Sequence, residues 1–243
     1  MKISIITVVK NDEKFIEKTI KSIINQNLLI EYIVVDGNST DATFEIIKKY
    51  QNMIDLIISE KDDGLYDAMN KGIKNATGDI IGICNSGDVI LENKLQIVLK
   101  EFETKKVDFV FATVKRHYTG GTIIKSGFNE KKINYNFDFA TCHSTGFYIK
   151  NSVQKEIGTY DTSFKCSADY DLFYRLINVK KYIGGSTPKD LIIGEVAKGG
   201  LSSQISFFNH LKEETKIRFK NKQSYILIIL IFLNAIIKKL FIK

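Results

Sequence analysis

The feature that most constrains the fold is an alternation of short apolar runs, rich in β-branched residues, with amphipathic segments in the first third of the chain. Each run has the length of a buried strand, and the four runs cover residues 3–9, 32–35, 56–58 and 80–83. Between the first two runs, isoleucines recur at helical spacing, and Asn11 or Asp12 is expected to cap that helix. Strands that alternate with helices predict an α/β fold with a parallel, doubly wound sheet.

Polar clusters follow three of these predicted strands, over residues 36–41, 62–67 and 85–88. In a parallel sheet the carboxyl ends of the strands lie at one edge, and ligands bind beyond that edge. We therefore expect the three clusters to converge on a single binding rim.

The second half of the chain lacks this regular alternation. The elements expected there are strands over residues 107–112, 114–118, 122–125, 145–149 and 191–193, and a helix over residues 169–177. Thr119-Gly120-Gly121 is expected to turn the chain between the second and third of these strands. No internal repeat or linker is visible, so we expect one domain over residues 1–205 and a helical appendage over residues 206–243.

The first polar cluster reads Asp36-Gly-Asn-Ser-Thr-Asp41. A carboxylate at a strand end can accept hydrogen bonds from the edge N–H of a pyrimidine base or from a ribose. The same residues also suit an ordinary strand–helix turn in which Ser39 or Thr40 starts the next helix. Both interpretations stay open for this cluster taken alone.

The stretch over residues 60–72 is the most informative one. It places four carboxylates, an asparagine and two lysines around a turn and the first turns of a helix. Asp67, Asn70 and Lys71 lie within one helical turn of each other, so some of them are expected to face a common cleft. The alternative is a solvated helix start with no ligand.

The third cluster, Asn85-Ser-Gly-Asp88, follows an uncharged strand. Hard divalent cations prefer oxygen ligands, and they take only one or two carboxylates when phosphates complete the coordination shell. Asp88, alone or with Asn85, is therefore a candidate to hold a cation against a diphosphate. Taken in isolation, the motif also fits a simple turn.

Taken together, these segments resemble glycosyltransferase family 2, the inverting enzymes with a GT-A fold. The resemblance runs through residues 1–200 in the family's order and spacing, and it rests on "VVDGNSTDAT" and "EKDDGLYDAMNKGI". The second stretch is especially similar to the branch that builds bacterial surface polysaccharides, including colanic-acid-type transferases. The resemblance implies an α/β fold with a mixed sheet flanked by helices, of the nucleotide-diphospho-sugar transferase type.

The resemblance also implies the site residues. It assigns Asp169 as the catalytic base and Asp88 as the ligand of a Mg²⁺ or Mn²⁺ cofactor. The donor-binding residues that it implies are Thr7, Val9, Asp36, Ser39, Asp63, Asp67, Asn70, Lys71, Asn85, Ser86, Asp88 and His143. The chain departs from the family where Asn85 and Gly87 replace the Asp-x-Asp pattern and where Ala168 replaces the Glu before the base.

The role that the resemblance gives to Asp169 agrees with the chemistry. Attack on an anomeric carbon needs a carboxylate that removes the proton of the acceptor hydroxyl as the bond forms. The alternative is that Asp169 and Asp171 only stabilise a helix start through its dipole. For His143, which can contact the donor or an acceptor phosphate, a purely structural role is equally open.

The excess positive charge is concentrated at the end of the chain. Of the net charge of +7, most comes from residues 211–243, which carry eight Lys or Arg and two Glu. Residues 225–237 are apolar except for Asn234, and this run is shorter than the roughly 20 residues of a bilayer-spanning helix. Lysines on both sides of the run favour a helix that lies in an anionic membrane surface, rather than nucleic-acid binding. A soluble core helix is the alternative.

The N-terminus and the cysteines predict the compartment. MKISIITVV is too short and too strand-like for a signal peptide. Cys84, Cys142 and Cys166 form no C-x-x-C pair, so a disulfide framework or structural zinc site is not expected. We expect a cytoplasmic protein that is peripheral to the inner face of the cell membrane.

The resemblance to glycosyltransferase family 2 implies a hexosyl- or N-acetylhexosaminyl-transferase of bacterial surface polysaccharide biosynthesis. Its donor is expected to be a nucleotide-sugar, with a UDP-sugar favoured, and its acceptor a saccharide or polyprenyl-linked saccharide. A sugar-nucleotide nucleotidyltransferase is one alternative, disfavoured because residues 7–12 contain no glycine. A non-catalytic membrane-associated scaffold of the same fold is the other, since the metal motif is reduced.

Overall fold

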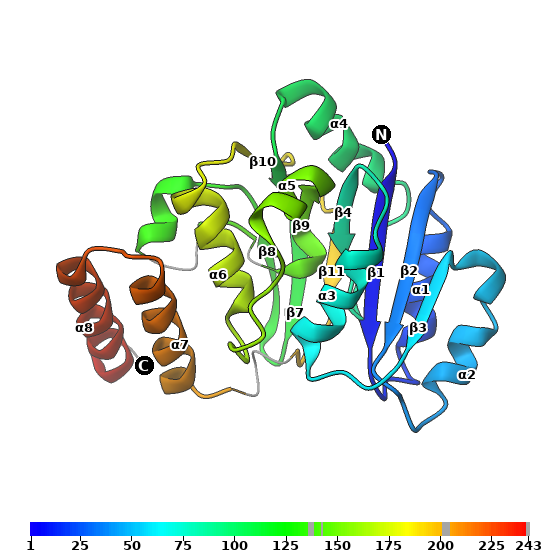
Figure 1. Ribbon diagram of the computed structural model, residues 1–243, viewed down its shortest axis with the longest axis horizontal. Coiled ribbons are helices and arrows are strands. Elements are labelled where there is room, and N and C mark those ends of the chain that lie inside the picture. The colour runs from blue at the N-terminus through cyan, green and yellow to red at the C-terminus, as the bar shows by residue number, and fades with distance from the viewer. Residues whose placement is uncertain (136–138, 142, 201–204, 242–243) are drawn as a thin grey trace.

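The computed structural model describes residues 1–135, 139–141, 143–200 and 205–241, and in this part of the chain a seven-stranded sheet forms the centre of the molecule (Figure 1). The strands lie in the order β10-β6-β9-β4-β1-β2-β3. Their bounds are β1 Ile3–Val9, β2 Ile30–Asp36, β3 Leu56–Ser59, β4 Ile80–Ile83, β6 Phe109–Phe111, β9 Phe147–Lys150 and β10 Gly184–Ser186.

The sheet is mixed. Strands β4, β1, β2 and β3 run parallel, as the alternation of strands and helices predicts, whereas β9 is antiparallel to both β4 and β6. Gly82 of β4 pairs with Tyr148 of β9. A Cβ atom at Gly82 would lie 2.6 Å from two atoms of the Tyr148 ring, so a glycine is needed for this pairing.

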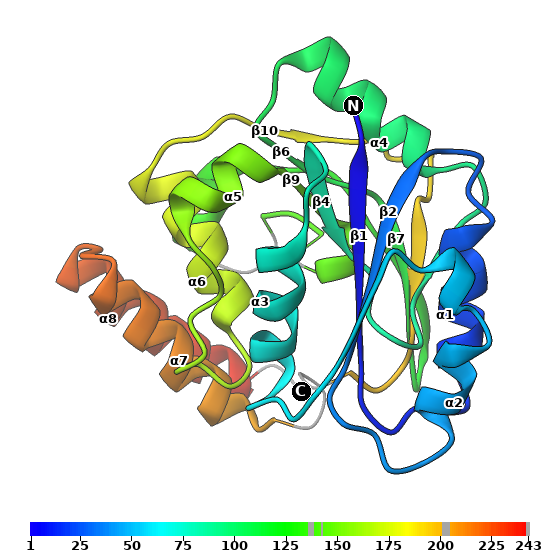
Figure 2. The same ribbon diagram turned by 45° about the vertical axis from the view of Figure 1, so that its right-hand side comes forward.

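Helices cover both faces of the sheet (Figure 2). Helices α1, α2 and α4 share one core cluster with β1 and β2, and helices α3, α5 and α6 share the cluster on the opposite face. The bounds of the helices and helical turns are α1 Ile16–Ile24, α2 Thr43–Lys48, η1 Gln51–Met53, α3 Leu65–Asn75, α4 Leu95–Lys105, η2 Glu130–Asn134, η3 Ser144–Gly146, α5 Asn151–Ile157, α6 Ala168–Tyr174 and η4 Arg175–Val179.

The first two helices begin later than expected. The caps predicted at Asn11 or Asp12 and at Ser39 or Thr40 are wrong, because α1 begins at Ile16 and α2 at Thr43. The physical reason is that these polar residues are bonded across the sheet edge. The Asp12 carboxylate accepts a hydrogen bond from the Ser86 hydroxyl (2.6 Å), and the Ser39 hydroxyl accepts one from the Asn11 amide (2.8 Å).

A second, four-stranded sheet lies against the first in the described residues, in the order β5-β11-β7-β8. The predicted hairpin is confirmed in β7 and β8, whereas the strand expected over residues 191–193 lies three residues later, as β11. Ile193 instead uses its amide to bond the Thr113 carbonyl oxygen (2.8 Å). The bounds are β5 Val89–Ile90, β7 Val114–Tyr118, β8 Gly121–Lys125 and β11 Gly194–Val196.

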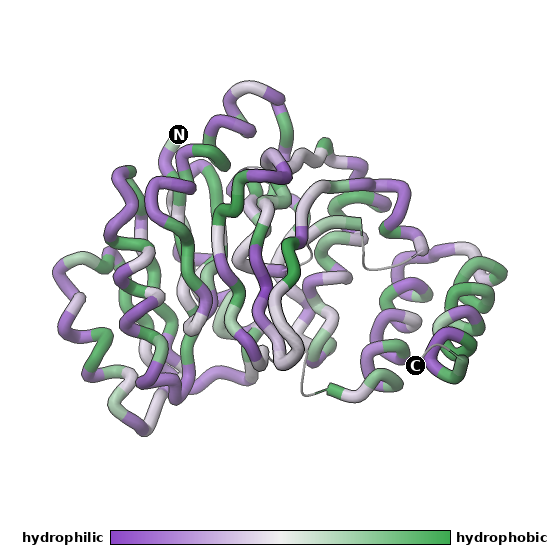
Figure 3. Tube along the Cα trace, turned by 180° about the vertical axis from the view of Figure 1, so that it is seen from behind, coloured by the Kyte–Doolittle hydropathy of each residue, from purple (hydrophilic) through white to green (hydrophobic). Residues whose placement is uncertain are grey.

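The C-terminal residues form two helices, α7 (Phe207–Lys220) and α8 (Tyr225–Phe241), which lie side by side beyond α6 (Figure 1). Helix α7 buries Ile217 in the core cluster of α3 and α6, and it buries the Arg218 side chain as well. Helix α8 is mostly apolar along its length (Figure 3). In the described part of the chain, every helix is too short or too polar to cross a membrane.

Candidate active site

The carboxyl ends of β1, β2 and β4 meet at one edge of the main sheet, as the polar clusters predict. Val9 at the end of β1 pairs with Asp36 at the end of β2. The Ser86 amide, beyond β4, donates to the Val8 carbonyl oxygen (3.1 Å). The Asp36–Asp41 turn and the Asn85–Asp88 turn are therefore neighbours.

Residues of β1 and β2 form the base of this rim. Asp36 is buried, and its carboxylate accepts hydrogen bonds from the Ser59 hydroxyl (2.7 Å) and the Ser39 amide (3.2 Å). Thr7 is fully buried, and its hydroxyl accepts from the Tyr32 hydroxyl (3.1 Å), so its side chain lies inside the sheet layer. Val9 is buried as well.

The segment before and within α3 forms the outer rim. The Asp67 carboxylate accepts from the Asp63 amide (3.1 Å), and this bond, together with Lys71 nearby, holds the pKa of Asp67 below its ordinary value. Lys71 pairs with Glu60 (2.9 Å) and Asp67 (3.3 Å). Asn70 turns the other way: its side chain bonds both the carbonyl oxygen and the amide of Tyr160 (2.9 Å each). Asn70 therefore positions the Tyr160 loop.

Asp88 is buried below the Asn85–Asp88 turn. One carboxylate oxygen accepts from the Thr145 hydroxyl (2.5 Å) and the other from the Ala197 amide (2.8 Å). Burial raises the pKa of Asp88 to about 6, against the opposing effect of these hydrogen bonds. His143 lies next to it, with Nδ1 3.8 Å from an Asp88 oxygen.

His143 is held in one tautomer by its surroundings. Its Nδ1 accepts a hydrogen bond from the Thr145 amide (3.3 Å), so the ring proton of the neutral imidazole is on Nε2. Burial, assisted by the charge of Arg116, lowers the pKa of His143 to about 3. At neutral pH His143 is therefore an uncharged hydrogen-bond donor.

Asp169 lies at the start of α6, where its carboxylate accepts from the Tyr170 amide (2.8 Å) and contacts the Tyr66 hydroxyl (3.5 Å). Burial raises its pKa to about 6. A carboxylate with a pKa near the working pH has the strongest combination of basicity and availability as a general base. The rings of Tyr66 and Tyr160, 5.4 Å apart, lie beside it.

A cavity of about 310 Å³ joins these elements. Of the residues predicted for the site, Asn85, His143 and Asp169 line it, and Asp88 lies next to His143. The other predicted donor residues do not line it: they occupy the rim, as Asp36, Ser39, Asp63, Asp67, Lys71 and Ser86 do, or the supporting layer, as Thr7, Val9 and Asn70 do.

Several cavity residues carried no recognisable signal in the sequence. Arg116 comes from β7 of the second sheet, and His210 and Glu214 come from α7. Each is a single polar residue in a segment of ordinary pattern. Their place at the cavity depends on the packing of elements far apart in the chain, which periodicity does not encode.

The residues at the cavity fit a divalent cation that takes most of its ligands from phosphate and water and few from the protein. Among the described residues there is no group of three or more His, Cys, Asp or Glu side chains that could enclose a metal ion. The Asn85 Oδ1 atom, however, is buried without a hydrogen-bond partner in the described chain, beside the cavity. An unpartnered amide oxygen near the buried carboxylate of Asp88 suits a cation whose shell is completed by phosphate and water.

The free cysteines carry no metal or redox arrangement in what is described. Cys84 and Cys166 are buried thiols, and Cys142 lies outside the described residues. Burial raises the pKa of Cys166 to about 12, so this thiol stays protonated although it borders the cavity.

Comparison with known proteins gives the family and the fold. Residues 4–168 match the glycosyl transferase family 2 domain. An uncharacterized glycosyltransferase of Methanocaldococcus jannaschii is 26% identical over 244 residues, covering 92% of this chain and 81% of the relative.

Two solved structures share the architecture. TarS of S. aureus in complex with UDP-GlcNAc superposes with a TM-score of 0.75 at 19% identity, covering 100% of this chain and 76% of that one. A mannosyltransferase of Pyrobaculum calidifontis, in complex with GDP-Man and Mn²⁺, gives a TM-score of 0.67 at 16% identity, covering 97% and 69%. At these identities the likeness shows the fold, which is the expected GT-A arrangement.

Proposed function

The chain belongs to glycosyl transferase family 2 and is a glycosyltransferase, and from this premise we propose that it is an inverting enzyme whose catalytic base is Asp169. The donor is a nucleotide-sugar, with a UDP-sugar favoured, and the acceptor is a saccharide, most simply one linked to a polyprenyl carrier. The pathway is the synthesis of a bacterial surface polysaccharide. The observation that carries the proposal is the position of Asp169 in a cavity that it shares with Asn85 and His143, and the raised pKa of Asp169 agrees with it.

The proposed step is a single displacement. Asp169 takes the proton of the acceptor hydroxyl while the hydroxyl oxygen forms a bond to the anomeric carbon. The bond from that carbon to the diphosphate oxygen breaks, and the nucleoside diphosphate leaves with the electron pair. The buried surroundings that raise the pKa of Asp169 to about 6 also make it a stronger base than an exposed aspartate.

Two other residues that line the cavity suit the leaving diphosphate. Neutral His143 can donate from Nε2 without a change of protonation, and the positive charge of Arg116 borders the same cavity. Donors placed where negative charge develops stabilise the transition state. Asp36, Asp63 and Asp67 at the rim are proposed to bind the nucleoside.

Asp88 and the Asn85 amide oxygen are the residues proposed to hold a Mg²⁺ or Mn²⁺ ion. Such an ion, when bound, neutralises charge on a diphosphate. The unpartnered Asn85 Oδ1 supports this assignment in a chain that has only one carboxylate in the motif.

The function is tested by incubating the purified protein with a panel of nucleotide-sugars and measuring release of nucleoside diphosphate. Release from one donor, increased by a saccharide acceptor, is the expected result. Release of pyrophosphate from a sugar phosphate and a nucleoside triphosphate would instead identify a nucleotidyltransferase. Binding of donors with no turnover under any condition would identify a non-catalytic scaffold.

We also propose that α8 lies in the surface of an anionic membrane, which would place the protein at the inner face of the cell membrane. Five apolar residues repeat at helical spacing along one exposed side of α8, with exposed fractions from 50% to 73%: Ile226, Leu230, Leu233, Ile237 and Leu240. Lys238 and Lys239 follow on the last turn of the apolar run. An exposed apolar stripe next to lysines is typical of helices that bind anionic lipid headgroups.

The membrane proposal is tested with vesicles. The protein should sediment with vesicles that contain phosphatidylglycerol and much less with neutral phosphatidylcholine vesicles. Ile226→Ser combined with Leu230→Ser should abolish sedimentation. Equal sedimentation of this variant and the wild type would contradict the proposal.

A further inference from the structure

Helix α7 contacts residues 165–167 of the loop that leads into α6, and these residues lie two to four positions before Asp169. The Glu213 carboxylate accepts hydrogen bonds from three successive amides, those of Lys165 (2.8 Å), Cys166 (3.0 Å) and Ser167 (3.0 Å). It also accepts from the Cys166 thiol (3.0 Å). One side chain of α7 therefore fixes the whole backbone segment from which the helix of the catalytic base starts.

We propose that Glu213 is a positioning residue for Asp169, and that α7 is in this sense a part of the active site. The inference rests on the proposed function, in which Asp169 is the base. The catalytic rate of this chain would then depend on a residue that lies in the C-terminal segment beyond residue 205.

The electrostatics of Glu213 agree with such a clamp. Burial opposes its ionisation, but the hydrogen bonds from the Cys166 thiol and the three amides outweigh burial and hold its pKa below the ordinary value. Hydrogen bonds donated to a charged carboxylate are roughly twice as strong as neutral ones. A carboxylate that accepts four of them is well suited to hold a loop that no regular strand or helix supports.

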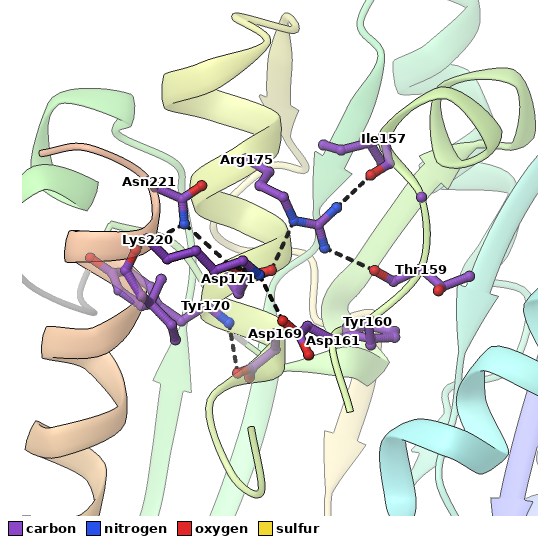
Figure 4. Close-up of polar contacts among 12 residues, drawn as sticks. Ile157, Thr159, Tyr160, Asp161, Asp169, Tyr170, Asp171, Arg175, Lys220 and Asn221 are labelled. Atoms are coloured by element: carbon purple, nitrogen blue, oxygen red, sulfur yellow. Dashed lines mark hydrogen bonds and ion pairs between the residues drawn. The ribbon is translucent and has the colours of Figure 1, made fainter. Parts of the chain in front are cut away.

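A second set of contacts joins the C-terminal end of α7 to α6 (Figure 4). The buried Asp171 carboxylate accepts from Lys220 (3.2 Å) and Asn221 (3.2 Å) at the end of α7, and it pairs with Arg175 (2.8 Å). Arg175 in turn donates to the Ile157 carbonyl oxygen and to that of Thr159 (2.8 Å). The loop that ends at Tyr160, the start of α6 and α7 are thus joined into one unit around Asp169.

The same helix supplies cavity wall next to the base. His210 and Glu214 of α7 line the cavity together with Asp169. Burial raises the pKa of Glu214, as it does that of Asp169. A shift of α7 would therefore move both the loop before the base and the cavity wall next to the base.

The buried Arg218 side chain gives α7 further contacts with the rest of the domain. Its Nη1 donates to the Asn134 carbonyl oxygen (2.8 Å) and to the Gln223 side chain (2.9 Å), and its guanidinium lies 5.2 Å from the centre of the Tyr170 ring. Arg218 is only 1% exposed. These contacts join α7 to the segment that ends at Asn134 and to the Tyr170 ring of α6.

The test compares Glu213→Gln and Glu213→Asp with the wild type, and with Glu103→Gln on an exposed position of α4 as the matched control. In Glu213→Gln an amide group replaces one of the accepting oxygens, so it cannot satisfy all four donors. In Glu213→Asp the charge is kept but the oxygens are withdrawn by one methylene. We expect kcat to fall about 10- to 100-fold in the first and less in the second, since a displacement of about 1 Å at a catalytic group can reduce the rate about 100-fold.

Three readouts separate positioning from loss of folding. The dissociation constant of the donor, measured calorimetrically, should stay within about twofold of the wild type, because the hydrogen bonds described for Glu213 go to residues 165–167 and not to the residues proposed to bind the donor. Hydrogen exchange of the amides of residues 165–167 should accelerate in both Glu213 variants and not in Glu103→Gln. The circular dichroism spectrum should be unchanged.

Two results would overturn the inference. One is an accelerated exchange of residues 165–167 with kcat unchanged, because the loop would then be released without effect on the base. The other is an exchange rate equal to that of the wild type. A wild-type protein that turns over no donor would refute the proposed function instead, while the exchange experiment would still decide whether Glu213 holds the loop.

Discussion

Replacing Asp169 by Asn should strongly reduce the rate of sugar transfer and raise the free energy of unfolding. The substitution keeps the size of the side chain and the oxygen that accepts from the Tyr170 amide, but it removes the charge. As general bases contribute about 10²- to 10⁴-fold to a rate, transfer should fall by that factor. Donor binding should be retained, because the hydrogen bonds described for the Asp169 carboxylate go to Tyr170 and Tyr66 and not to the residues proposed to bind the donor.

The stability gain follows from the pKa. Burial raises the pKa of Asp169 from 3.8 to about 6, and each pKa unit corresponds to about 1.36 kcal/mol, so ionised Asp169 destabilises the folded state by roughly 3 kcal/mol. The carboxylate is partly exposed to the cavity, which reduces this value, and we expect Asp169→Asn to raise the free energy of unfolding at pH 7.5 by about 1–3 kcal/mol.

The difference in unfolding free energy between Asp169→Asn and the wild type should depend on pH. Above pH 6 the carboxylate is ionised in the folded and the unfolded chain, and the folded state bears the full penalty of burying the charge. Below pH 3.8 the carboxyl is protonated in both states, so the substitution has no effect. The difference in stability should therefore decline as the pH falls from 6 to 3.8.

The transfer assay tests the expected loss of activity. Urea unfolding tests the expected gain in stability, and it is measured at pH 7.5 and at the lowest pH at which the protein stays folded. Asp169→Asn at pH 7.5 should show a higher urea midpoint with the same slope. Near-normal turnover would refute the assignment of the base. A variant that is less stable than the wild type at pH 7.5 would refute the view that burial is what raises the pKa of Asp169.

Three further outcomes are expected. The ratio kcat/KM should fall about tenfold from pH 7 to pH 5, since a base with a pKa near 6 is then mostly protonated; a flat profile over this range would contradict the raised pKa. Asp88→Ala should abolish metal-dependent donor binding in a calorimetric titration, whereas full activity of chelator-treated wild-type protein would disprove the metal site. Gly82→Ala should lower the free energy of unfolding by about 1–3 kcal/mol, because the added Cβ would lie 2.6 Å from the Tyr148 ring. Gly120→Ala is the control, because its Cβ would have nothing within 4 Å, and urea titration should show no change in its stability.

The order of strands and helices in the first third of the chain could be predicted because three of the four apolar runs there are buried on both faces, and the fourth, over residues 56–58, is partly buried. Residues 3–9 are buried without exception, which is what a continuous run of Ile and Val indicates. The strand expected over residues 145–149 is found as β9 (Phe147–Lys150), but its antiparallel direction could not be read from its pattern, since its partners β4 and β6 are distant in sequence. The helix starts were misplaced because polar residues suited to capping are bonded across the rim.

The site was predictable in part, because Asn85 lies in a turn that follows a strand and the family resemblance points to His143 and Asp169. Asn85, His143 and Asp169 line the cavity, and their types and positions are visible in the sequence. Arg116 and Glu213 were not foreseen. Arg116 comes from a hairpin of the second sheet and Glu213 from a helix treated as an appendage. Only tertiary packing brings Arg116 to the cavity and Glu213 to the loop before the base.

The bond between Glu213 and the loop before α6 has a consequence for biosynthesis. A ribosome that adds about 5–20 residues per second reaches Glu213 about 2 to 9 s after it has passed Asp169. During that interval the nascent chain lacks the carboxylate that accepts hydrogen bonds from the amides of residues 165–167. If Glu213 positions Asp169 as we propose, a chain released before Glu213 is translated would contain the base but not the side chain that positions it.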